Sequence, residues 1–346
     1  MMRGVAILGI VLHNFCHWLG PIVKENEYTF SPHNTAVLDQ VLGNPDVNLP
    51  LHLLSFFGHY GVPVFLFLSA FGLEKKYGSA QERVNPVAFT ANHFSKLFRM
   101  MVIGFALFTA IDAMTPGSWH YTPAQVVGQL TLTNNLFASP DRNIWPGPYW
   151  FFGLMLQFYI VYIALIHRRH WGFTVALMVL CTVPEAFMGK ESEALNWYRY
   201  NFMGGMLPFG LGVIYARFGE RLIPPSTKNW ELLFGVLVSA ALCFAFSYVY
   251  ILWLLAPALV CLNAALLARW LSNTAHTAWL TGPLLSAGSL SAALFVVHPI
   301  TRKIFIPISR GGDFYVGLAL YVVASVVLAM AIDRFLKRGK AQTEKP

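Results

Sequence analysis

The chain has 346 residues, of which 56% are hydrophobic and only 12% are charged. Because soluble domains carry about 25% charged residues, this composition excludes a water-soluble globule, a disordered chain and a coiled coil, and it predicts a membrane protein. The net charge of +8 comes from Lys and Arg scattered at the ends of apolar segments, so we expect no nucleic-acid partner.

Ten apolar runs approach the length of roughly 20 residues that a spanning helix needs. They lie at about 4–20, 51–73, 97–114, 149–166, 171–188, 201–217, 230–247, 249–268, 284–305 and 313–335. We therefore expect an all-α polytopic protein in which residues 1–346 form a single integral-membrane domain. The apolar part of segment 115–148 is too short to span, and we expect that segment to be re-entrant or interfacial on the outer side.

The basic residues sort to alternate sides of these ten spans. With the N-terminus inside, 17 Lys and Arg residues fall on the cytoplasmic side and 7 on the outer side. Cytoplasmic loops are enriched in Lys and Arg, so this distribution favours ten spans with both termini in the cytoplasm.

Four histidines lie at mid-depth in the predicted spans: His13 and His17 in the first, His59 in the second and His298 in the ninth. At 1.5 Å per residue, His13 lies about 14 Å from the cytoplasmic start of its helix, and His17 follows one turn later on the same face. Ionisable groups within spans usually mark function. The alternative for each histidine is a hydrogen bond to a neighbouring helix.

Cations lie at the predicted cytoplasmic ends of the spans. Arg3 begins the first span, and Lys96 and Arg99 stand three residues apart at the start of the third, one turn after His93. Arg and Lys donors in this position could bind a cytosolic phosphate-rich ligand. The alternative is that they contact lipid head groups. Ser69, in the second span, is by itself typical of a packing hydroxyl.

The order of these residues along the chain resembles the pattern of integral-membrane acyltransferase family 3. Members of that family O-acylate cell-envelope glycans and related acceptors. The motifs that carry the resemblance are Arg3 to His13, Gly61-Val-Pro-Val-Phe-Leu-Phe-Leu-Ser69, Lys96 with Arg99, Tyr149-Trp150-Phe-Phe-Gly, the glycines 204, 205, 210 and 212, and Val297-His298-Pro299.

The sequence departs from the family pattern in the first span. Family members usually have ten residues between the functional Arg and His, whereas nine separate Arg3 from His13, and Asn14 occupies the usual His position. One residue of slip rotates a helical side chain by 100°, so His13 and His17 both stay candidates. Ala70 also replaces a typical glycine, and Lys96 replaces a frequent arginine.

The resemblance implies an acyltransferase that moves an acyl group, acetyl in the first instance, from cytosolic acyl-CoA to a hydroxyl of an envelope glycan. It implies a bacterial cytoplasmic (inner) membrane location, acyl-CoA as donor and no metal. The resemblance further implies that the CoA phosphates bind to Arg3, Lys96 and Arg99, and that His13 is the general base. The remaining site candidates are His17 and His298 for catalysis and Asn14, His59, Ser69 and Trp150 for the acceptor.

Two functions from other classes stay open. A secondary transporter or flippase for a glycan or anionic metabolite usually depends on mid-membrane carboxylates, and the predicted spans have none at their centre. A haem or metal protein could use His13, His17 and His59 as ligands. Transfer or hydrolysis of acyl-CoA by the purified protein and its visible absorption discriminate among the three.

Overall fold

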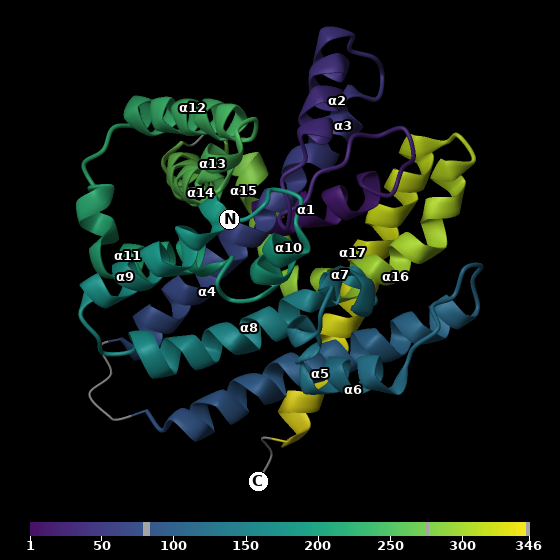
Figure 1. The fold of residues 1–346 in the computed structure, drawn as a ribbon, viewed down its shortest axis with the longest axis horizontal. Coiled ribbons are helices and arrows are strands. Elements are labelled where there is room, and N and C mark those ends of the chain that lie inside the picture. The colour runs from purple at the N-terminus through teal and green to yellow at the C-terminus, as the bar shows by residue number, and fades with distance from the viewer. Residues whose placement is uncertain (79–83, 275–276, 344–346) are drawn as a thin grey trace.

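The computed structural model describes residues 1–78, 84–274 and 277–343, and these ranges fold into helices and turns without a strand. Figure 1 shows the arrangement of the helices. Their bounds are α1 (Met2–Cys16), α2 (Pro32–Gly43), α3 (Leu49–Phe57), α4 (Gly61–Tyr77), α5 (Pro86–Ala113), α6 (Pro123–Thr131), α7 (Pro140–Asn143), α8 (Trp150–Val161), α9 (Trp171–Thr182), α10 (Glu193–Tyr200), α11 (Met206–Leu222), α12 (Asn229–Phe246), α13 (Tyr250–Trp253), α14 (Ala256–Asn273), α15 (Ala278–Ser289), α16 (Ser291–Arg310) and α17 (Phe314–Thr343).

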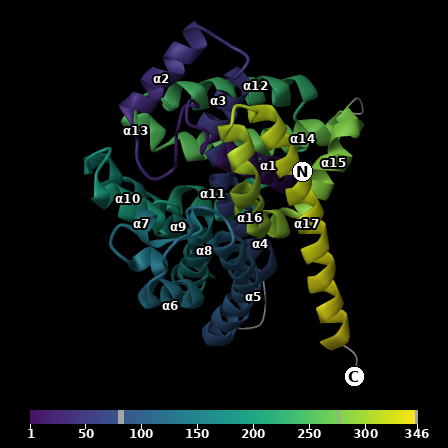
Figure 2. The ribbon, with the colours of Figure 1, turned by 90° about the vertical axis from the view of Figure 1, so that its right-hand side faces the viewer.

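The predicted all-α membrane fold is confirmed. Among the described residues, six helical segments are long and apolar enough to cross a bilayer. They are Leu49–Tyr77, Pro86–Ala113, Gly147–Ile166, Asn229–Phe246, Ser291–Arg310 and Phe314–Lys337. Two of the other predicted spans coincide with the shorter apolar helices Met2–Cys16 and Trp171–Phe187. The remaining two overlap α11 and the pair α13 and α14, so the count of ten stays a prediction. In both views α2 and the end of α17 lie at opposite ends of the molecule (Figures 1 and 2).

Several predicted spans have different bounds in the structure; for example, α5 begins at Pro86 rather than near residue 97, and the predicted span 249–268 is divided between α13 and α14. The helix within 4–20 ends at Cys16, where bonds such as Leu19 N to Cys16 O tighten the chain ahead of Gly20 and Pro21. The predicted span 284–305 is divided at Leu290, between α15 and α16. Gly and Ser are weaker helix formers than Ala or Leu, which is consistent with a break in the sequence Gly288-Ser-Leu-Ser291.

α1 lies at the centre of the fold and packs against α3, α4, α15, α16 and α17. Glycines allow this close approach. A Cβ atom on Gly58 would lie 2.6 Å from the Gly9 carbonyl oxygen and 2.7 Å from the His13 Cβ atom, and one on Gly61 would overlap the Ala6 carbonyl oxygen. Small residues at helix interfaces serve the same purpose in membrane proteins generally. The chain from Gly58 to Gly61 is thereby held directly against the middle of α1.

The glycines of the sixth predicted span also act in packing. A Cβ atom on Gly212 would overlap the Phe67 carbonyl oxygen, with the Ala70 Cβ atom 2.9 Å away. α11 and α4 therefore lie against each other through small residues on both sides. The replacement of a family glycine by Ala70 is compatible with this contact.

Segment 115–148 forms the short helix α6 and further turns. Thr122 and Gln125 cap α6 reciprocally, and the helix ends at Leu132 in the left-handed conformation. Asn135 then donates its amide to the carbonyl oxygens of Trp150, at 3.0 Å, and Tyr200, at 2.7 Å. The segment is thereby fixed to α8 and α10, while its depth in the membrane stays a prediction.

Candidate active site

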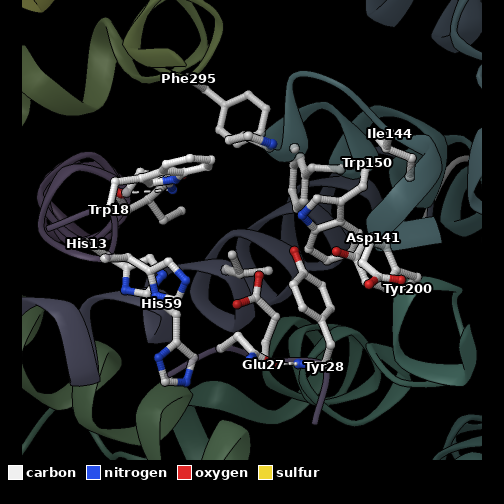
Figure 3. Close-up of a pocket in the computed structure, with 18 of the residues that line it drawn as sticks. His13, Trp18, Glu27, Tyr28, His59, Asp141, Ile144, Trp150, Tyr200 and Phe295 are labelled. Carbon is white, nitrogen blue, oxygen red and sulfur yellow. Dashed lines mark hydrogen bonds between the residues drawn. The ribbon is translucent and has the colours of Figure 1, made fainter. Parts of the chain in front are cut away.

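A cavity of about 280 Å³ lies at the C-terminal end of α1. We call it the histidine cavity. Its lining includes His13, Asn14, His17, Trp18, Glu27, Tyr28, His59, Asp141, Trp150, Tyr200, Phe295 and Arg302. Figure 3 shows that His13 and His59 lie on one side of it, that Asp141, Trp150 and Tyr200 lie on the other, and that Glu27 and Tyr28 lie between the two groups, with Tyr28 beside Trp150 and Tyr200.

His13 is held in one orientation by a backbone carbonyl. Its Nδ1 lies 2.7 Å from the carbonyl oxygen of Ser55 in α3. A carbonyl oxygen only accepts hydrogen bonds, so Nδ1 carries the proton and the neutral ring keeps its lone pair on Nε2. His13 is 8% exposed and lines the cavity. The ring is therefore oriented to accept a proton from a molecule bound there.

Two further imidazoles adjoin His13. Its ring centroid lies 5.2 Å from that of His17 and 5.6 Å from that of His59. His59 is 2% exposed, and neither of its ring nitrogens has a hydrogen-bond partner among the described residues. Buried polar atoms are almost always paired, so a ligand or water in the cavity is the expected partner of His59.

The helical spacing of α1 explains the first pair, and close packing explains the third imidazole. His13 and His17 are four residues apart and so share a face. His59 lies in the single 3₁₀ turn Gly58–Tyr60 between α3 and α4. Gly58 fits against Gly9 and His13 only because it lacks a Cβ atom, and this contact brings His59 to His13.

The segment that follows α1 supplies cavity residues that sequence reasoning missed. Asn26 Oδ1 accepts the backbone N–H groups of Tyr28 and Thr29, at 2.8 and 3.0 Å, which forms a tight turn. Ser55, whose carbonyl orients His13, also donates its hydroxyl to the Val23 carbonyl oxygen at 2.6 Å. His13 and the chain just before this turn thus contact the same residue of α3.

Glu27 places a carboxylate in the histidine cavity. This contradicts the expectation that the buried groups are imidazoles, which followed from the absence of carboxylates at the centre of the predicted spans. Its side chain points into the cavity beside Tyr28 (Figure 3). Burial raises the pKa of Glu27 from its ordinary 4.5 to about 7, although Tyr28 and Arg199 act in the opposite direction. The expectation failed because Glu27 lies outside the predicted spans and returns to the cavity through its turn.

Arg199 of α10 holds this turn in place. Its Nε donates to the Glu27 carbonyl oxygen and its Nη1 to Glu185, with both side chains of the ion pair buried. Its guanidinium also lies 4.2 Å from the centroid of the Trp253 ring. Arg199 is therefore a positioning residue for Glu27.

Aromatic rings form the wall around Tyr28. The Tyr28 ring stacks on Tyr200 with centroids 3.9 Å apart and meets Trp150 edge-on at 5.1 Å. Such a wall, next to carboxylates, suits a ligand with both apolar C–H faces and hydroxyl groups. Trp150, the predicted acceptor residue, lies within this group.

α16 contributes a buried cation, Arg302. In the predicted topology it is one of the seven basic residues on the outer side of the membrane. Arg302 is 5% exposed and lines the histidine cavity. Its Nη1 donates to Asn14 Oδ1 at 3.0 Å, and its guanidinium lies 4.7 Å from the Trp18 ring centroid. The sequence feature that could have identified Arg302 is its position one helical turn after His298 within an apolar run.

His298 is adjacent to the cavity but does not line it. The side chain is fully buried, with Nδ1 3.2 Å from the Leu294 carbonyl oxygen and Nε2 without a partner in the described part of the chain. Its ring packs against Phe295, which does line the cavity. Its catalytic role stays a prediction.

The predicted donor-binding residues are not brought into one cavity. Arg3 lines a second cavity, of about 600 Å³, at the other end of α1, together with Arg269 of α14. We call it the Arg3 cavity. Lys96 and Arg99 are not part of its lining. Ser69 lines neither cavity, and its neighbour Leu68 lines the Arg3 cavity.

No group of three or more His, Cys, Asp or Glu side chains in the described ranges is arranged to hold a metal ion. The cluster of His13, His17 and His59 is thus an imidazole site without the geometry of a metal centre. Neutral imidazoles can accept or donate protons and hydrogen bonds.

A comparison with protein families identifies the chain. The model of acyltransferase family 3, described as an acyltransferase domain, matches residues 1–334. The chain belongs to acyltransferase family 3. It is therefore an acyltransferase, and its apolar helices make it a membrane enzyme. No curated protein and no solved structure gives a match.

Proposed function

We propose that this family 3 acyltransferase moves an acyl group, acetyl in the first instance, from cytosolic acyl-CoA to a hydroxyl of an envelope glycan. His13 acts as the general base in the histidine cavity. The observation that carries the proposal is the His13 geometry, because Nδ1 is engaged with the Ser55 carbonyl oxygen and Nε2 is left to accept a proton.

The two cavities at opposite ends of α1 support separate binding of donor and acceptor. Arg3 and Arg269 line the cavity at the predicted cytoplasmic end, and guanidinium groups bind phosphates well. Lys96 and Arg99 add positive charge on the same predicted side. About 15 Å of helix separates Arg3 from His13, a length that an extended pantetheine arm covers.

In the acceptor site, Trp150 and Tyr28 contact a sugar ring, and Asn14, His59 and Glu27 bind its hydroxyl groups. The size of the histidine cavity, about 280 Å³, lies at the lower end of ligand sites and suits a single sugar unit. The glycan's remaining units would lie outside the cavity.

The transfer itself needs one base and no covalent enzyme intermediate. His13 Nε2 takes the proton of the acceptor hydroxyl while the hydroxyl oxygen attacks the thioester carbonyl carbon. The tetrahedral intermediate then collapses, the C–S bond breaks, and the CoA sulfur receives the proton from His13. The products are the acylated acceptor and free CoA.

Label transfer from radiolabelled acetyl-CoA to crude envelope glycan tests this proposal. General-base catalysis contributes about 10²–10⁴-fold, so H13A should lower kcat at least about 100-fold while the protein inserts and folds normally. H120A, which removes an exposed histidine outside the cavity, is the matched control. Normal turnover by H13A together with loss in H17A would transfer the role of base to His17. No transfer by the wild type would contradict the proposed activity.

A further inference from the structure

Arg302 is a buried cation without a carboxylate partner. Arg199, Arg217 and Lys303 each pair with a buried carboxylate. Arg302, the residue before Lys303, takes part in no ion pair among the described residues. Leaving a charge buried and uncompensated costs several kcal/mol, so a retained charge of this kind points to an anion that occupies the cavity during function.

The guanidinium is placed with reference to the base. Asn14, the residue after His13, donates Nδ2 to the Ile10 carbonyl oxygen, which directs its Oδ1 toward Arg302 Nη1. The same Nη1 reaches the Asn14 carbonyl oxygen at 3.4 Å. Arg302 Nε and Nη2 donate to no side chain or backbone carbonyl in the described part of the protein, where Nη1 is the donor of its hydrogen bonds. These donors are available to a ligand in the cavity that His13 lines.

The carboxylates of the cavity do not neutralise this charge. Glu27 and Asp141 line the same cavity, yet neither forms an ion pair with Arg302. The cavity is thus cationic at α16 and acidic at the Glu27 turn. An anion formed beside His13 would be stabilised at the α16 side.

We propose that Arg302 is a catalytic residue whose guanidinium binds the oxyanion formed from the thioester carbonyl during transfer. The inference rests on the proposed function. When the acceptor oxygen attacks the carbonyl carbon, the C–O bond forms and the carbonyl π electrons move to the oxygen, which becomes negative. Arg302 Nε and Nη2 donate to that oxygen until the C–S bond breaks and the carbonyl re-forms. Fixed donors of this kind act mainly on the transition state.

The test compares R302Q and R302K with R310Q. Arg310 is the matched control, because it lies on the same helix and its guanidinium approaches the same Trp18 ring, at 5.8 Å, but it is exposed and outside the cavity. Loss of an oxyanion donor lowers kcat by about 10²–10³-fold. We expect R302Q to show that loss with KM for acetyl-CoA within about threefold of wild type, R302K to be intermediate, and R310Q to be within about twofold.

A second measurement separates catalysis from packing. In R302A, millimolar guanidinium ion should restore part of kcat, because it can occupy the vacated space. A kcat for R302Q or R302K within threefold of wild type, or a loss confined to KM, would overturn the assignment of Arg302. If R302Q fails to fold in a thermal unfolding assay, R302K decides, with a loss of at least tenfold in kcat supporting the proposal. Absence of transfer by wild type would instead contradict the proposed function.

Discussion

At the residue scale, Ser55 connects the two sides of the catalytic chemistry. Its carbonyl oxygen orients the His13 ring, and its hydroxyl donates to Val23 at the start of the turn that carries Glu27. His13 and the segment that leads to Glu27 therefore share one contact on α3. A displacement of α3 would move both groups together.

Glu27 predicts a pH dependence of stability. Burial raises its pKa from 4.5 to about 7, so between these values the native state binds more protons than the unfolded state. Its contribution to stability is fully present below about pH 4.5 and is lost as the pH rises to about 7. E27Q removes this titration, so its Tm relative to wild type should rise by a few degrees between pH 5 and pH 7.5 in detergent. A pH-independent difference would contradict the raised pKa of Glu27.

The ion pair of Arg199 and Glu185 predicts a large loss of stability on truncation. R199M leaves the Glu185 charge buried without a partner and should lower the free energy of unfolding by about 3–5 kcal/mol. The double variant R199M/E185L should recover part of that loss. R142M is the control, because its ion pair with Glu193 is exposed, with 73% and 74% of the side chains accessible, and should cost less than about 1 kcal/mol. Equal effects of R199M and R142M would rule out a structural role for the buried pair.

At the scale of elements, the contact between α1 and the chain from Gly58 to Gly61 decides the geometry of the imidazoles. The backbone of one element lies directly against the backbone of the other, with no room for a Cβ atom. A methyl group added at this contact would therefore displace His13 relative to His59.

G58A should separate these elements. Overpacking costs about 1–3 kcal/mol, and a displacement of about 1 Å in a catalytic group can cost about 10²-fold in rate. We expect G58A to lose at least tenfold in kcat with a modest fall in Tm. G72A, on the exposed face of α4 with no atom within 4 Å of its added Cβ, should leave both unchanged or raise Tm. Full activity in G58A would show that the close contact is not needed.

At the scale of the whole molecule, α1 joins two cavities that face opposite predicted sides of the membrane. The Arg3 cavity lies at its N-terminal end and the histidine cavity at its C-terminal end. An enzyme that takes its donor from the cytosol and its acceptor from the outer face needs this arrangement. The predicted topology is therefore part of the proposed mechanism.

Cysteine labelling tests that topology. The four native cysteines are buried, so an impermeant maleimide should report only introduced thiols. In intact spheroplasts K190C, in the predicted outer segment before α10, should be labelled, and K228C, before α12, should be labelled only after permeabilisation. Both positions are exposed. Labelling in the reverse order would place the Arg3 cavity outside and exclude a cytosolic donor.

The sequence by itself determined the fold class and the family, and it named five candidates that the structure gathers in the lining of one cavity: His13, Asn14, His17, His59 and Trp150. Hydropathy and helical spacing are properties of neighbouring residues, so they locate apolar helices and place His13 and His17 on one face. The motif order then pointed to the family that the comparison with protein families confirmed.

Only the tertiary structure decided which distant residues complete the cavity. Asn14 and Arg302 meet across 288 positions of sequence, and Glu27 reaches the cavity because Arg199 and Ser55 hold its turn. It also brought Arg269 together with Arg3 in the lining of one cavity that Lys96 and Arg99 do not line. Such contacts depend on how helices pack, and packing depends on small-residue contacts and buried hydrogen bonds that no local pattern of hydrophobicity encodes.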